Sequence, residues 1–329
     1  MSPTNRDAAR LAWARAATND PSIELVRASV DAGFRSYWRT LNHASPGSVI
    51  VMDSPPDKED VRPWLAMSDV LESGGVRVPQ VIARDVEAGF LLLEDLGADT
   101  YLHVIDSNNA DTLFDDAIDQ LLKLQSIPVP ASLPSYDDSM LACELKLFDE
   151  WFVGRHLGMT LDRGDLEGLD LVYRRLIDAA IAQPQVLVHR DFMPRNLMPG
   201  VSAPGILDFQ DAVGGAIAYD PVSLLKDAFL TWPRQRVQTW LHSYHSRASA
   251  AGLPVPAWPG FVHDAEWCGV QRHLKILGIF VRLRVRDGKP KYADDLPRFI
   301  AYLLDVLPRY PELAGLERLL RRHAPVSAA

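Results

Sequence analysis

Short apolar runs, and apolar residues that alternate with polar ones, dominate roughly the first hundred residues of the chain. These patterns predict five strands, over residues 24–29, 37–41, 48–53, 76–86 and 89–97. Turn-forming residues at 30–34 and 42–47 separate the first three strands. Helical spacing of apolar residues predicts a short helix over 5–17 and another over 58–73. This part of the chain is therefore expected to form a small sheet with one helix among its strands.

Most of the remaining chain has the apolar spacing of packed helices. Helices are predicted over residues 111–126, 138–158, 164–182, 221–231, 234–251, 262–286 and 292–307. Only the apolar runs 186–188 and 205–207 predict strands within this helical part, and we expect them to form one strand–loop–strand unit. We predict an α+β fold of two lobes. The N-lobe (1–96) has a mainly antiparallel sheet with one helix and binds a nucleotide, and the larger C-lobe (97–329) is mostly helical.

Composition and charge exclude several classes of protein. The net charge is −9 and no block of Lys or Arg is present, which argues against a nucleic-acid partner. Cys143 and Cys268 are far apart and lack metal-site spacing, as expected in a reducing compartment. The first residues lack the apolar core of a signal peptide, and no uncharged apolar stretch is long enough to span a membrane. We expect a cytoplasmic protein without an obligate protein partner.

Two fragments carry the candidate chemistry, "VLVHRDFMPRNLM" at 186–198 and "GILDFQDA" at 205–212. Asp191 precedes Asn196 by five residues, and Asp208 ends the next apolar run. A carboxylate such as Asp191 can orient an acceptor hydroxyl and take its proton, while Asn196 and Asp208 offer the oxygen ligands that Mg²⁺ prefers. Asp and Asn in loops are more often caps or turn formers. Their combination with a helix start at Asp220-Pro221 favours phosphoryl transfer.

His189-Arg190-Asp191 through Asn196 resembles the catalytic loop of the protein-kinase-like superfamily, and Asp208 stands where that superfamily has its metal-binding Asp. The short interval before Asp208, without an Ala-Pro-Glu motif, is typical of the aminoglycoside phosphotransferase branch. The resemblance implies a bilobal protein-kinase-like fold, with ATP as phosphoryl donor and Mg²⁺ as cofactor. It also implies that His189 and Asp220 support the catalytic loop.

The N-lobe resembles that family less completely. "FLLLEDLG" is similar to the strand that leads into the family's hinge, which implies that adenine is held by the carbonyl of Glu94 and the amide of Leu96. The segment "SVDAGFRS" has one glycine, Gly33, whose neighbourhood could offer backbone N–H groups to phosphate. The lysine that this family carries on its third strand is replaced by Met52. The cations that could take its place are Arg35, which we favour, and Arg39 or Lys58.

Longer segments, including "HRDFMPRNLM" and "QRHLKILGIFVRL", resemble kinases that phosphorylate N-acetylmuramate and N-acetylglucosamine in peptidoglycan recycling. The resemblance implies transfer to the anomeric C1 hydroxyl of an amino sugar. Arg272 and Lys275 can share a helical face and bind the lactyl carboxylate, or form a solvated basic face. Gln210, Asp211 and Glu144 could bind sugar hydroxyls. Otherwise Gln210 and Asp211 would form hydrogen bonds within their loop, and Glu144 would be exposed on its helix.

Other functions stay open on this sequence. An aminoglycoside kinase would need an acidic rim, which the net charge fits and the cationic helix at 270–278 does not. A choline or homoserine type of kinase is also possible, and the eight tryptophans could include an aromatic cage for a quaternary ammonium group. A non-catalytic pseudokinase sensor would explain the missing lysine. The presence of Asp191, Asn196 and Asp208 together favours an enzyme.

Overall fold

The computed structural model describes residues 3–29, 34–41 and 47–323. It divides the chain into two compact units, residues 1–107 with 195–210, and residues 108–194 with 211–329. The boundary predicted after residue 96 falls inside the first unit. Residues 195–210, which the prediction placed in the helical lobe, belong to the first unit as well. No helix among the described residues combines the length and apolar character that a membrane span requires.

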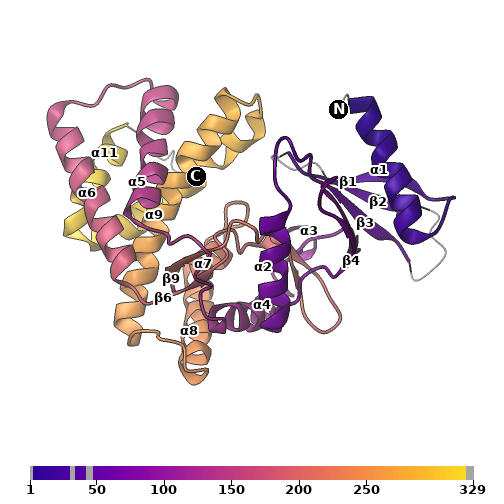
Figure 1. Cartoon of the computed structure of the whole chain (residues 1–329). Helices are drawn as coiled ribbons and strands as arrows, with labels where there is room; N and C mark the ends of the chain where they lie inside the picture. The colour runs from indigo at the N-terminus through magenta and orange to yellow at the C-terminus, as the bar shows by residue number, and fades with distance from the viewer. Residues whose placement is uncertain (1–2, 30–33, 42–46, 324–329) are drawn as a thin grey trace. The chain divides into compact units, whose positions relative to one another are not determined.

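The first unit is built on a five-stranded sheet (Figure 1). Its strands follow in spatial order as β1 (Glu24–Ser29), β2 (Ser36–Leu41), β3 (Val49–Asp53), β5 (Phe90–Glu94) and β4 (Val81–Asp85). Every neighbouring pair is antiparallel, which confirms the predicted fold class. The last two strands are shorter than predicted, because proline at 79 and a turn with Gly89 at positive φ bound them.

Two helices pack on this unit. α1 (Pro3–Thr18) places Ala14 in a small core with Val49, Val51 and Leu92 of the sheet. Arg6 and Arg10 of α1 both donate hydrogen bonds to the buried carboxylate of Asp53, at 2.6 to 2.9 Å. α2 (Arg62–Ser73) begins four residues later than predicted, because a proline stands in its first turn. A short helix, α3 (Tyr101–Val104), was not predicted.

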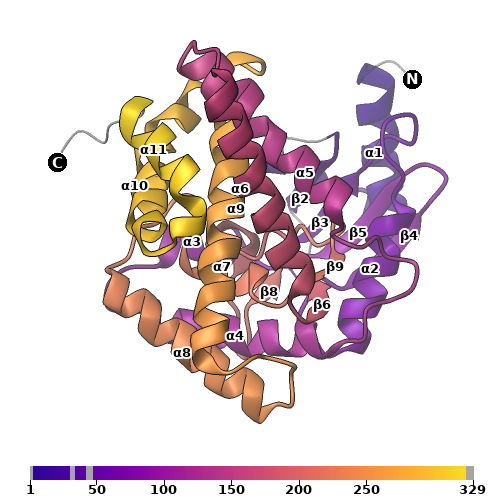
Figure 2. The ribbon, with the colours of Figure 1, turned by 90° about the vertical axis from the view of Figure 1, so that its left-hand side faces the viewer.

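The second unit is mostly helical (Figure 2). Its helices are α4 (Ala110–Ser126), α5 (Asp138–Leu147), the π-helix η1 (Phe148–His156), α6 (Arg163–Ala182), α7 (Tyr219–Leu225), α8 (Arg234–Ala250), α9 (Trp258–Val285), α10 (Leu296–Val306) and α11 (Ala314–His323). α9 is the central helix and packs against α5, η1, α6 and α10. Almost every residue from Ala265 to Val281 is buried.

The two short strands predicted near the catalytic loop do not pair with each other. β6 (Gln185–Val188) pairs with β9 (Val213–Ala216) in the second unit, and β7 (Leu197–Met198) pairs with β8 (Gly205–Ile206) in the first. The predicted strand–loop–strand unit is therefore wrong. β7 has only two residues, and β9 contains two consecutive glycines, so neither has the local pattern of a strand. The helix predicted over 221–231 ends at Leu225, and α11 was not predicted.

Gly278 marks the closest approach of α9 to the junction of α5 and η1. A Cβ atom at this position would lie 2.4 Å from the carbonyl carbon and oxygen of Leu147. We expect Gly278→Ala to reduce the free energy of unfolding by roughly 1–3 kcal/mol or more, because backbone cannot move aside as a side chain can.

Gly269 on the same helix is the matched control. A Cβ atom there would meet its nearest neighbour, Val222 Cγ1, at an ordinary 3.6 Å. Gly269→Ala should be neutral or stabilising by up to about 1 kcal/mol, since alanine favours helix. Urea unfolding of the two variants measures both effects, and equal midpoints would contradict the close contact at Gly278.

Candidate functional site

A short hairpin in the first unit holds Asn196 and Asp208 next to each other. β7 and β8 form its two strands, and Leu207 N–H donates to the carbonyl of Asn196 at 2.9 Å. Asp208 therefore follows the residue that is bonded to Asn196. Its backbone is left-handed, with φ of 64°, and Gln210 Nε2 donates to its Oδ1 at 2.9 Å. The hairpin thus fixes a carboxamide and a carboxylate on neighbouring chains.

Both of these residues line a cavity of about 260 Å³ whose walls belong entirely to the first unit. β2, β3 and β5 contribute one wall through Arg39, Ile50 and Leu93, and the segment after β5 contributes another. Gly205 allows the hairpin to come this close, because a Cβ atom there would lie 2.4 Å from Leu96 Cδ1. The predicted adenine contacts, Glu94 and Leu96, also line this cavity. The cavity therefore gathers the predicted metal ligands and the predicted adenine contacts.

Ion pairs hold the two acidic residues at the end of β5. Glu94 accepts hydrogen bonds from both terminal nitrogens of Arg77, and these bonds lower the pKa of its carboxyl. Arg39 donates to both carboxylate oxygens of Asp95, at 2.6 and 2.9 Å, and to the carbonyl of Gly97. The side chains of Glu94 and Asp95 thus bond to other protein groups, and the backbone here is what could contact an adenine base.

Of the other sequence candidates for the nucleotide, Arg39 lines this cavity, whereas Arg35 and Lys58 do not. Gly33 lies outside the described residues. Arg35 is buried and pairs with Glu59 at 3.0 Å, and it is not among the residues that line the cavity. Met52 is fully buried in the sheet. Of the lining residues, Arg39 and Arg195 are the cationic ones, and Arg195 is exposed.

Asp191 follows β6 in the second unit, on a backbone with an unusual turn. Arg190 has φ of 74°, a left-handed conformation that costs a non-glycine residue of the order of 1–3 kcal/mol. Asp220, at the start of α7, accepts the N–H groups of His189 and Arg190 at 2.7 and 3.0 Å. Asp191 N–H donates to His189 Nδ1 at 3.2 Å, which leaves the imidazole proton on Nε2 when the ring is neutral. His189 and Asp220 thus each bond to the backbone of the loop that carries Asp191.

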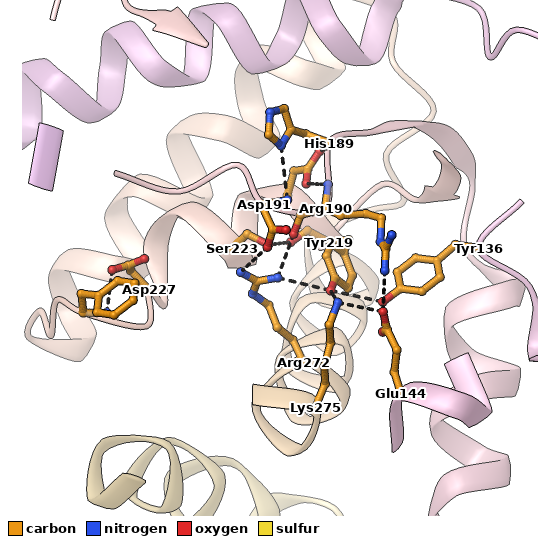
Figure 3. A network of polar contacts seen from close by, with 12 residues as sticks. Tyr136, Glu144, His189, Arg190, Asp191, Tyr219, Ser223, Asp227, Arg272 and Lys275 are labelled. Atoms are coloured by element: carbon orange, nitrogen blue, oxygen red, sulfur yellow. Dashed lines mark hydrogen bonds and ion pairs between the residues drawn. The ribbon is translucent and has the colours of Figure 1, made fainter. Parts of the chain in front are cut away.

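A buried polar network underlies this loop (Figure 3). The carboxylate of Glu144, on α5, accepts hydrogen bonds from Tyr136 and Gln271 and pairs with Lys275 at 2.8 Å and with Arg190 at 2.6 Å. Burial raises the pKa of Glu144, but the charge of Lys275 and the hydrogen bonds outweigh it, so the pKa lies below its ordinary value. Glu144 is therefore the anion that pairs with both the buried Lys275 and the half-buried Arg190.

Arg272 and Lys275 project from α9 into the same network. Arg272 is 2% exposed and lies 3.8 Å from the carboxylate of Asp191. Burial raises the pKa of Asp191, and the positive charges of Lys275 and Arg272 more than offset this, so the pKa lies below its ordinary value. Asp191 is consequently ionised at neutral pH, as a hydroxyl-orienting base must be.

The predicted sugar-binding residues are divided between the two units. Glu144, Arg272 and Lys275 share the buried network of the second unit, whereas Gln210 bonds to Asp208 in the first. Asp211 is exposed, and its carbonyl accepts a long hydrogen bond from Arg190. Sequence reasoning missed Tyr136 and Tyr219, whose hydroxyls join the network. The only signal for Tyr219 was its position directly before Asp220.

Asp227, beyond the end of α7, is a buried carboxyl in the same unit. Its Oδ2 accepts the N–H groups of Phe229 and Leu230, while Oδ1 has no hydrogen-bond partner among the described residues. Burial raises its pKa to about 6. The folded state therefore binds this proton more tightly than the unfolded state, and the free energy of unfolding falls as the pH rises from about 4 through 6.

Asp227→Asn removes this ionisation and keeps the acceptor for the two N–H groups. We expect the melting temperature of the variant, relative to wild type, to rise between pH 5 and pH 8. Differential scanning calorimetry across this range measures the difference. A difference that does not change with pH would mean that Asp227 does not titrate in the folded protein.

Comparison with known proteins adds the following. A model of the phosphotransferase enzyme family matches residues 24–261. N-acetylmuramate/N-acetylglucosamine kinase of Pseudomonas putida is 52% identical over 303 residues, which cover 91% of this chain and 88% of that protein. The Pseudomonas aeruginosa protein of the same name is 47% identical over 301 residues, with the same coverage. An ADP-bound aminoglycoside phosphotransferase has the same fold, with TM-score 0.58 at 16% identity over 89% of this chain and 96% of that chain.

Proposed function

Because the chain belongs to the phosphotransferase enzyme family, as its catalytic-loop motif predicted, we propose that it uses ATP to phosphorylate the C1 hydroxyl of N-acetylmuramate and N-acetylglucosamine. The observation that carries the proposal is the high identity to two kinases of that name over most of both chains. We place the reaction in cell-wall recycling in the cytoplasm, where ATP is available.

The proposed step is direct transfer between two oxygens. The anomeric oxygen forms a bond to the γ-phosphorus of ATP as the bond from that phosphorus to the β–γ bridging oxygen breaks, which releases ADP. The proton of the C1 hydroxyl passes to the carboxylate of Asp191. Asn196 and Asp208 would hold the Mg²⁺, because both line one cavity and offer the hard oxygen ligands that this ion prefers. A bound Mg²⁺ would neutralise charge on the β- and γ-phosphates.

We propose the cavity of the first unit as the nucleotide site, with adenine held by the backbone of Glu94 and Leu96. Arg195 is the proposed replacement for the missing lysine. It is exposed, lines the cavity and directly precedes Asn196, one of the two proposed metal ligands. Arg39 lines the cavity too and is the second candidate; its guanidinium binds Asp95 and the carbonyl of Gly97. We keep Asp211 and Gln210 as proposed contacts for sugar hydroxyls.

Arg195→Gln should weaken binding of Mg-ATP about tenfold or more and binding of ADP by less, because a hydrogen bond to a charged group contributes roughly 1.5–3 kcal/mol. Calorimetric titration of both nucleotides, without sugar, measures this. Arg84→Gln is the matched control, since Arg84 is exposed on β4 and does not line the cavity. Equal affinity of Arg195→Gln and wild type for Mg-ATP would exclude Arg195 as the phosphate cation.

The acceptor is tested by ATP consumption against a panel of N-acetylmuramate, N-acetylglucosamine, glucosamine, kanamycin, choline and homoserine. The proposal requires turnover with at least one of the two N-acetylated sugars. Turnover with kanamycin or choline alone would retain a kinase and replace the sugar. ATP binding without turnover of any acceptor would favour a nucleotide sensor.

A further inference from the structure

Both polar groups of the peptide that joins Arg190 to Asp191 are bonded. Its N–H, that of Asp191, donates to His189 Nδ1 at 3.2 Å, and Asp220 accepts the N–H groups of the two peptides before it. Its carbonyl, that of Arg190, accepts from Arg272 Nη1 at 2.9 Å, and Arg272 Nη2 lies 3.8 Å from the Asp191 carboxylate. Arg190 itself has a left-handed φ of 74°. One buried guanidinium therefore contacts both the strained residue and the carboxylate that follows it.

We propose that Arg272 is a positioning residue that fixes the orientation of Asp191 by clamping the Arg190–Asp191 peptide, and that it does not bind substrate. This inference rests on the proposed function only in that Asp191 is the group that receives the hydroxyl proton. A guanidinium suits this role because its planar fork donates in two directions at once. A primary ammonium is a point charge and cannot reproduce that geometry.

Burial separates this role from the substrate contact expected from the sequence. Arg272 is 2% exposed, whereas the side chain of Asp191 is 44% exposed. A substrate can therefore reach Asp191 and not the guanidinium behind it. The guanidinium of Arg272 is engaged by the Arg190 carbonyl, the Asp191 carboxylate and the Tyr219 hydroxyl.

The rest of the network holds the guanidinium in place. The hydroxyl of Tyr219 accepts from Arg272 Nη1 at 3.2 Å and from Lys275 Nζ at 3.3 Å. Lys275 pairs with Glu144, and Glu144 also pairs with the side chain of Arg190. Arg272 and Lys275 therefore share a neutral acceptor, while Lys275 and Arg190 share the carboxylate of Glu144. Glu144 holds the charges of the other two cations, and Arg272 bonds to the Arg190 carbonyl.

The test is Arg272→Lys in the full chain, assayed with ATP and the preferred sugar. We expect kcat to fall about a hundredfold, because small misplacement of a catalytic group has effects of this size. The KM values for sugar and ATP should stay within about threefold of wild type, since neither substrate contacts residue 272. Arg284→Lys, at an exposed position of the same helix, is the control and should retain wild-type kcat.

The outcomes separate the possibilities. If Arg272→Lys raises the KM for the sugar and leaves kcat unchanged, Arg272 binds substrate. If the variant changes neither kcat nor KM, the contact of Arg272 with the peptide is dispensable. Either result overturns the inference. If Arg272→Lys fails to fold, Tyr219→Phe decides, because it keeps Arg272 and the aromatic ring and removes the hydroxyl that accepts from Arg272 and Lys275. A fall in kcat at constant KM supports the inference, and unchanged kcat contradicts it. If the wild-type protein phosphorylates no sugar at all, that result contradicts the proposed function and is distinct from a failure of the positioning role of Arg272.

Discussion

Asp191→Asn is expected to lower kcat for sugar phosphorylation by about 10²–10⁴-fold, the range found for the loss of a general base. Asparagine has nearly the same shape, but its amide cannot take the proton of the hydroxyl. The carboxylate is suited to that task, because the charges of Lys275 and Arg272 hold the pKa of Asp191 below its ordinary value and keep it ionised at neutral pH. Steady-state kinetics with saturating ATP measures the loss.

Nucleotide binding distinguishes this effect from misfolding. Asp191 does not line the cavity of the first unit, so the variant should bind Mg-ATP with about the affinity of wild type. Asp178→Asn, which changes an exposed Asp on α6, is the matched control and should keep full activity. If Asp191→Asn retained more than about a tenth of wild-type kcat, proton transfer to Asp191 would not be part of the rate-determining step.

Glu144→Gln is expected to have the largest effect on stability. Glutamine preserves the shape of the side chain and removes the negative charge that pairs with Lys275 at 2.8 Å and with Arg190 at 2.6 Å. Because the buried Lys275 and the half-buried Arg190 then lose this counter-charge, we expect the free energy of unfolding to fall by roughly 3–5 kcal/mol. For a unit of this size, that corresponds to a melting temperature lower by roughly 10 °C.

The control for this variant lies on the next helical segment. Glu150 is exposed, and Glu150→Gln should change the free energy of unfolding by less than about 0.5 kcal/mol. Thermal melting followed by circular dichroism, without ligands, compares the two variants. A melting temperature of Glu144→Gln equal to wild type would mean that water replaces the carboxylate and that the network is not closed to solvent.

The elements that could be predicted are those whose own residues show the hydrophobic pattern and the flanking turn residues. β1 has the predicted bounds, and β2 and β3 each begin within one residue of the prediction, because alternation and turn residues mark them directly. β7 and β9 could not be predicted, because one has two residues and the other two glycines, and pairing with distant segments creates them. The π-helix η1 continued a helical pattern, and the pattern does not distinguish the two kinds of helix.

The candidate site shows the same limit. The spacing of Asp191, Asn196 and Asp208 predicted a phosphoryl-transfer motif, and the hairpin places the last two together on one cavity wall. The spacing of Arg272 and Lys275 predicted a shared face of a helix. Their burial could not be predicted, because Arg and Lys are rarely buried unless paired, and the pairing partner Glu144 belongs to another helix. Contacts distant in sequence therefore decided their proposed role.

The central claim is transfer of the γ-phosphoryl group to an anomeric hydroxyl, and phosphorus NMR of the product tests it most directly. The enzyme would be incubated with Mg-ATP and N-acetylmuramate, and in parallel with N-acetylglucosamine, and proton-coupled spectra would be recorded. The account predicts a phosphomonoester resonance coupled to the C1 proton of the sugar, together with ADP. A phosphomonoester coupled to the C6 protons, or inorganic phosphate and ADP without a sugar phosphate, would contradict it.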